Sequence, residues 1–170
     1  MAHSLTAPAT EESGNTRSQW LTASTGALDQ HCPMASIVKE TRIDAPPERV
    51  WDALRDVGAL HTRLVPGFVV DTRMEENARV VTFGNGMVAR EEIVSIDEAR
   101  HRVAWAIVGG NFRHYHGAAR VEADPNGGSR FVWTADLLPD DLAGQVDEMM
   151  SVGISVVKKT LEGTVERKTV

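Results

Sequence analysis

The sequence has 170 residues, 42% of them hydrophobic, and a formal net charge of −6, which together suit one soluble domain with a buried core. The negative charge argues against nucleic acid as a partner, and the lack of a long apolar run argues against membrane insertion. The single cysteine, Cys32, excludes an internal disulfide and a metal site built from several cysteines. We therefore expect a cytoplasmic protein, monomeric or weakly dimeric, that uses no cofactor.

The first part of the chain differs from the rest in composition. Residues 1–34 are rich in Ser, Thr, Ala and Gly and follow neither the period of a strand nor that of a helix. Segments of this kind bury too little apolar surface to fold alone, so we expect a disordered extension. The folded domain is then predicted over residues 35–165, with a short tail at 166–170.

Patterned sequence begins with an alternating strand at Ala35–Ile43. The prolines that follow it suit the first turn of a helix, because the missing N–H is unpaired there in any case. We predict a short amphipathic helix over Pro47–Asp56 and a second over Val57–Leu64, which Pro66-Gly67 ends.

A run of strands follows, separated by short connections rich in Gly, Asn, Asp and Glu. Connections this short join antiparallel neighbours, whereas parallel strands need long crossovers. The six predicted strands are Phe68–Met74, Ala78–Phe83, Met87–Ile96, His101–Val108, His114–Glu122 and Ser129–Leu138.

A long helix is predicted after Pro139-Asp140-Asp141, with an aspartate as its N-cap. Its apolar stripe at helical spacing consists of Leu142, Val146, Met149, Met150, Gly153, Val157 and Leu161. Gly153 is unexpected, because glycine inside a helix costs about 1 kcal/mol relative to alanine. We expect it to leave space for a ligand between the helix and the sheet, near Met149, Met150 and Val157.

The order of these elements and three motifs resemble the START/Bet v 1-like (SRPBCC) superfamily, in particular its bacterial polyketide cyclase/dehydrase branch. The motifs are Ile43-Asp44-Ala45-Pro46-Pro47-Glu48-Arg49-Val50-Trp51, then Pro66-Gly67, then Val132-Trp133-Thr134. The resemblance covers residues 36–163. It implies an α+β helix-grip fold, in which a curved antiparallel seven-stranded sheet wraps around the long C-terminal helix.

A weaker likeness is to the plant abscisic-acid receptors of the same fold. Gly109-Gly110-Asn111-Phe112-Arg113 resembles their latch loop, and Gly84-Asn85-Gly86 stands where their gate loop lies, although the gate's own Ser-Gly-Leu-Pro pattern is absent. The likeness implies that these two loops flank a pocket. It also implies that the cavity is lined by Glu91, Trp105, Ile107, Tyr115, Gly117 and Thr134.

Two polar residues are candidates for chemistry inside such a cavity. The resemblance prefers Glu91 to Glu92 for the inward position, and a carboxyl group among apolar side chains can act as an acid or base. The same carboxylate could instead orient a ligand hydroxyl, or pair with Arg90 or Arg102 outside the cavity. His61, just before Pro66-Gly67, is either a packing residue or a second proton-transfer group.

His114 and His116 lie two residues apart in a strand and so share one face, which permits a metal site with His61 or Glu91 as the third ligand. The alternation of the same strand places its small and apolar residues on the inner face. We therefore expect both histidines in solvent and predict no metal.

The sequence favours a binding module that carries or senses a small hydrophobic or aromatic ligand. The alternative is a cofactor-independent cyclase or dehydratase in which Glu91 and His61 exchange protons and Tyr115 positions an oxygen. A third possibility is a domain that binds a protein partner through its loops.

Overall fold

The computed structural model describes residues 34–163. Residues 1–33 of the predicted extension and the predicted tail at 166–170 lie outside this range. The elements, in chain order, are β1 (Ala35–Ile43), α1 (Pro47–Arg55), the π-helical turn η1 (Leu60–Leu64), β2 (Val69–Met74), β3 (Ala78–Phe83), β4 (Val88–Asp97), β5 (Arg102–Ile107), β6 (His114–Ala123), β7 (Ser129–Leu138), the 3₁₀ turn η2 (Asp140–Leu142) and α2 (Ala143–Gly163).

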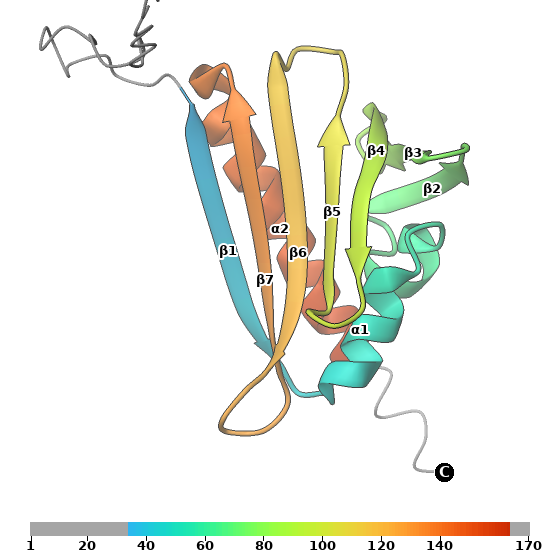
Figure 1. Cartoon of the computed structure of the whole chain (residues 1–170), viewed down its shortest axis with the longest axis vertical. Coiled ribbons are helices and arrows are strands. Elements are labelled where there is room, and N and C mark those ends of the chain that lie inside the picture. Colours follow the sequence, from blue (N-terminus) through green and yellow to red (C-terminus); the bar gives the residue numbers. More distant parts are fainter. Residues whose placement is uncertain (1–33, 164–170) are drawn as a thin grey trace, which may run out of the picture. The chain divides into compact units, whose positions relative to one another are not determined.

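The seven strands form one sheet in the order β1-β7-β6-β5-β4-β3-β2, and every neighbouring pair is antiparallel. The strands from β2 to β7 follow one another as hairpins, while α1 and η1 carry the chain from one edge of the sheet to the other. Figure 1 shows α2 running behind the sheet and α1 near its lower end. The predicted helix-grip fold is confirmed.

Strand alternation decides which side chains meet α2. In β6, Tyr115, Ala119 and Val121 are buried on the inner face, whereas His114 and Arg120 on the outer face are exposed, as predicted. Two irregular registers, one in β2 and one in β4, interrupt the ladder. Bulges of this kind bend a strand and increase its twist, so the sheet can curve toward the helix.

Polar contacts hold both ends of α2. Near its start, Nζ of Lys39 lies 2.7 Å from Oδ1 of Asp147. Near its end, Oε1 of Glu162 accepts hydrogen bonds from Lys158 and from the backbone N–H of Asp44, and these bonds hold the pKa of Glu162 below its ordinary value. The helix is thereby tied to the β1 side of the sheet.

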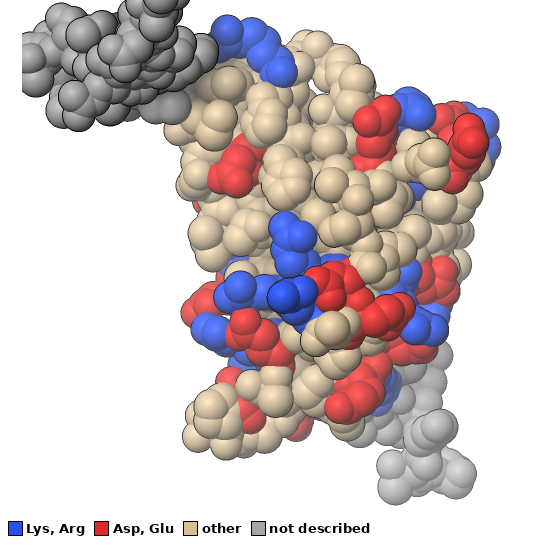
Figure 2. Space-filling view, viewed as in Figure 1, with Lys and Arg blue, Asp and Glu red and all other residues tan. Residues whose placement is uncertain are grey.

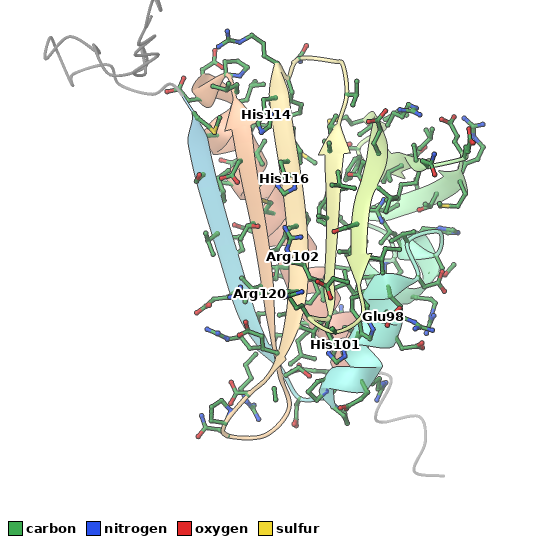
Figure 3. The ribbon with its side chains drawn as sticks, viewed as in Figure 1. Glu98, His101, Arg102, His114, His116 and Arg120 are labelled. Carbon is green, nitrogen blue, oxygen red and sulfur yellow. The ribbon has the colours of Figure 1, made fainter. Side chains whose placement is uncertain are left out.

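The lower end of the sheet is covered by α1. Trp51 of this helix donates a hydrogen bond of 2.8 Å from its indole N–H to Glu98 and stacks on His101, with ring centroids 5.2 Å apart. Figure 3 labels Glu98 and His101 at the turn between β4 and β5. The contact fixes α1 against that turn and closes this end of the core.

Three local predictions need correction. The second short helix begins at Leu60, not Val57, because residues 57 and 58 form a turn. β5 begins after His101, whose φ of 45° lies in the left-handed region and cannot continue a strand. The helical turn after β7 has Pro139 as its N-cap without a side-chain cap, because both aspartates lie inside the turn.

Gly153 marks a close approach between α2 and the sheet. A Cβ atom there would lie 2.7 Å from Cζ3 of Trp133 and 3.1 Å from Cε1 of Phe68. The expectation that Gly153 leaves space for a ligand is therefore wrong, because two aromatic rings occupy that space.

We predict that Gly153→Ala destabilises the protein by about 1–2 kcal/mol, since overpacking costs more than the gain in helix propensity. Gly144→Ala is the matched control in the same helix, because a Cβ atom there meets nothing within 4 Å. The control should be neutral or stabilising by up to about 1 kcal/mol. Urea unfolding of the two variants measures the difference, and equal effects would contradict the role given to Gly153.

Candidate ligand-binding cavity

A cavity of about 260 Å³ lies between the inner face of the sheet and the first half of α2. Its walls come from β3, β4, β5, β6, β7, α2 and the loops before β4 and β6. Most of the lining is apolar, and the residues are Phe68, Phe83, Met87, Val88, Ala89, Arg90, Glu91, Ile107, Val108, Gly109, Gly110, Asn111, Phe112, Tyr115, Trp133, Leu142, Gln145, Val146, Met149 and Met150.

A second, smaller cavity of about 60 Å³ lies deeper, toward α1 and η1. Its lining includes Trp105 and Val157, together with residues of α1, η1, β2, β3, β6 and β7. Four residues line both cavities, namely Phe68, Phe83, Glu91 and Trp133. Three aromatic rings and one carboxylate therefore separate the two spaces.

Glu91 forms a buried ion pair with Arg79, and their side chains are only 8% and 5% exposed. The Nε of Arg79 donates a hydrogen bond of 2.7 Å to Oε2 of Glu91, and its Nη1 donates one of 3.3 Å to the carbonyl of Val57. The guanidinium also lies over the Trp105 ring, 5.4 Å from the centroid. The countercharge of the Glu91 carboxylate therefore lies inside the protein, on the neighbouring strand β3.

Tyr115 is the other buried polar residue of the larger cavity. Its ring packs beside Phe112, with centroids 5.0 Å apart. Burial, and to a smaller extent the negative charge of Glu91, raises the pKa of the Tyr115 phenol far above its ordinary value. The phenol therefore stays protonated and can donate a hydrogen bond into the cavity.

Seven of the ten residues predicted to contact a ligand line one of the two cavities. The larger cavity contains Glu91, Ile107, Tyr115, Met149 and Met150, and the smaller one contains Trp105, Val157 and again Glu91. Their contact with a ligand stays a prediction.

The other three lie elsewhere. Thr134 is on the outer face of the sheet, opposite Ala118 in the register, and donates a hydrogen bond to the carbonyl of that residue. Gly117 is covered by the Trp105 ring, since a Cβ atom there would lie 2.5 Å from Cε2 of that ring. The space beside Gly153 is filled in the same way by the rings of Trp133 and Phe68. The expectation that Thr134 faces the cavity is wrong, because Trp133 holds the inward position beside it.

The two proposed proton-transfer residues are not brought together. Glu91 lies between the cavities, whereas His61 lines neither of them. The Nδ1 atom of His61 is buried and has no hydrogen-bond partner among the described residues. Glu91 pairs with Arg79 and not with Arg90, whose partners are Glu75 and Glu92 on the surface.

Sequence reasoning missed Arg79, although the signal was present. The strand Ala78–Phe83 alternates so that Arg79 shares its face with Val81 and Phe83. An arginine in line with two inward apolar residues predicts a buried cation, which in turn requires an anion nearby. Glu91 lies directly opposite Arg79 on β4.

The outer face of the sheet differs in character. Charged side chains gather over its lower half, where Arg130 pairs with Glu122 and Arg120 pairs with the same carboxylate (Figure 2). His114 and His116 lie higher on this face (Figure 3); His116, predicted to be in solvent, is half-buried. Among residues 34–163, no group of three or more His, Cys, Asp or Glu residues could hold a metal ion.

Comparison with known families decides the wider class of the protein. Residues 34–167 match the family described as polyketide cyclase / dehydrase and lipid transport. The chain belongs to this family. The predicted membership of the SRPBCC superfamily is thereby confirmed. No curated protein matches the chain.

Solved structures with the same fold are distant in sequence. One is an uncharacterised protein from Bacillus thuringiensis, with 14% identity, a TM-score of 0.68, and coverage of 75% of this chain and 98% of that one. Another is the protein XoxI from Bacillus cereus, with 16% identity, the same TM-score, and coverage of 75% and 95%. At this identity the likeness shows the fold alone. In the described part of the chain, no helix has the length and hydropathy needed to cross a bilayer.

We predict that Arg79→Met destabilises the protein by about 3–5 kcal/mol, because it leaves the Glu91 carboxylate buried without a countercharge. Arg73→Met is the matched control, since Arg73 pairs with Glu75 at 3.3 Å but its side chain is 67% exposed. An exposed pair of this kind contributes about 0–1 kcal/mol. Thermal or urea unfolding compares them, and a small effect of Arg79→Met would contradict the importance of the buried pair.

Proposed function

We propose that the protein binds a small hydrophobic or aromatic ligand in the larger cavity and carries or senses it without changing it. The observation that carries this proposal is a largely apolar space beneath the sheet whose buried acid, Glu91, is already paired with Arg79. Ligand sites are concave and mostly apolar, with a few polar groups that orient the ligand. Membership of a family described by both cyclase and lipid-transport activity is consistent with this proposal.

The geometry supports the enzyme alternative less well. A two-residue acid/base mechanism needs both groups within reach of one substrate. His61 lines neither cavity, and the Glu91 carboxylate is already hydrogen-bonded to the buried guanidinium of Arg79. A carboxylate held in place by this contact can orient a ligand, whereas the second group that proton transfer needs does not line the same cavity.

Filling the cavity should abolish binding without unfolding the protein. Ala89 lines the larger cavity from β4, so Ala89→Trp places an indole where the ligand is proposed to lie. Val94 is in the same strand but is 58% exposed and lines neither cavity, which makes Val94→Trp the matched control. Native mass spectrometry after incubation with a bacterial lipid extract should show a retained ligand on the wild type and on Val94→Trp only.

Equal retention by Ala89→Trp would place the ligand outside this cavity and contradict the proposal. Circular dichroism and unfolding curves of both variants show that a loss of binding does not come from a loss of fold. A wild-type protein that retains nothing from extracts and binds no hydrophobic dye would also contradict it.

A further inference from the structure

Two polar side chains of the larger cavity, Glu91 and Tyr115, lie in one row with Arg79 across the inner face of the sheet. The register places Arg79 opposite Glu91 and Glu91 opposite Ile107. Continued by one residue, the pairing of β5 with β6 brings Ile107 beside Tyr115, which itself lies opposite Leu137. Glu91 and Tyr115 are thus separated by a single apolar residue and about 10 Å of backbone, the width of two strand spacings.

Each of these two polar groups has hydrogen-bonding capacity that the protein leaves unused. Oε2 of Glu91 accepts from Arg79, but no group among residues 34–163 donates to Oε1. The Tyr115 hydroxyl likewise has no hydrogen-bond partner in the described part of the chain, although the residue is only 6% exposed. Both oxygens belong to side chains that line the same cavity and have no protein partner among residues 34–163, so a ligand in the cavity can pair them.

The two groups have complementary roles. The carboxylate oxygen can only accept a hydrogen bond, while the protonated phenol can donate one. A ligand hydroxyl over Ile107 matches both, because it donates to Glu91 and accepts from Tyr115. An ether or carbonyl oxygen matches only the phenol, and a ligand without oxygen matches neither.

The charge of the site selects against ions. Arg79 and Glu91 neutralise each other within the row, so the cavity has no net charge to offer from this pair. An anionic ligand would bring a second negative charge beside Glu91 in an apolar space, which is costly. A cationic ligand would lose its hydration and approach the buried guanidinium of Arg79.

The walls set the size and shape of the ligand. The cavity volume of about 260 Å³ is slightly below the range of about 300–1,000 Å³ that is usual for ligand pockets, so the ligand must be small. Five aromatic side chains line it, namely Phe68, Phe83, Phe112, Tyr115 and Trp133. A flat ligand of one or two rings fits such a space and stacks on such walls.

We propose that the cavity selects an uncharged, flat ligand of one or two rings that carries a hydroxyl group, held between Oε1 of Glu91 and the hydroxyl of Tyr115. This inference rests on the proposed function, because it names the class of ligand for the same cavity.

Four probes with one ring system test it: 2-naphthol, 2-methoxynaphthalene, naphthalene and naphthalene-2-carboxylate. Isothermal titration calorimetry of the full chain at neutral pH gives their dissociation constants. We expect 2-naphthol to bind at least tenfold more tightly than each of the other three, since the loss of one hydrogen bond to a buried charged group corresponds to roughly that factor.

Two variants test whether Tyr115 and Glu91 cause the preference for 2-naphthol. Tyr115→Phe removes one hydroxyl without touching the ion pair and should weaken 2-naphthol severalfold while leaving naphthalene unchanged. Thr134→Val is the matched control, because it removes a hydroxyl from the outer face of the sheet. Glu91→Gln leaves Arg79 without its anion, so naphthalene-2-carboxylate should gain at least tenfold in affinity while 2-naphthol loses affinity.

The outcomes separate this inference from the proposed function. Equal affinities for all four probes, or an unchanged preference in Tyr115→Phe, would overturn the inference and leave the apolar cavity as the binding site. Failure of every probe while a ligand from the lipid extract is retained would overturn it as well. Failure of every probe together with an empty protein after the extract would overturn the proposed function itself. If Glu91→Gln does not fold, Tyr115→Phe still decides between these outcomes.

Discussion

One helix has to cover the inner face of a seven-stranded sheet, and it is too narrow to do so. Seven strands at about 4.8 Å spacing span roughly 29 Å, whereas a helix with its side chains is about 10–12 Å wide. The helix α2 packs mainly on β1, with further contacts to β7 and η1, while α1 and η1 cover the lower end. Near the start of α2, the side chains of the helix do not fill the space over the middle strands, and the larger cavity lies there.

The ion pair of Arg79 and Glu91 gives this space its chemical character. A lone buried charge would be costly, but the opposite charges of Arg79 and Glu91 on adjacent strands neutralise each other. The Trp105 face and the Val57 carbonyl complete the environment of the guanidinium. One oxygen of the Glu91 carboxylate has no donor among residues 34–163, and Glu91 lines both cavities. The cavity is therefore apolar on most of its surface and polar along one row.

Close packing elsewhere explains why the cavity stays where it is. Two glycines, Gly117 and Gly153, admit the rings of Trp105 and Trp133 into positions where any side chain would collide with them. The centroids of these rings lie 6.3 Å apart; both rings line the smaller cavity, and Trp133 also lines the larger one. Glycine in this fold thus serves to close the core, which is the opposite of the role expected for Gly153 from the sequence.

Alternation and turn residues in the sequence were sufficient to predict the order of the elements, the antiparallel sheet and the inward face of β6. These properties depend on neighbours within about ten residues, so the period of apolar residues, two in a strand and 3.6 in a helix, indicates them directly. The opening motif from Ile43 to Trp51 indicated the family. The apolar stripe of α2 predicted part of the cavity wall.

Only the tertiary structure decided which inward residues meet. Arg79 and Glu91 stand twelve residues apart, and their contact depends on the register of β3 against β4. The side chain of Thr134 faces outward because Trp133 takes the adjacent inward position. Whether Gly153 faces space or a ring depends on where α2 crosses β7. These are distances between elements, and a pattern along one chain carries no record of them.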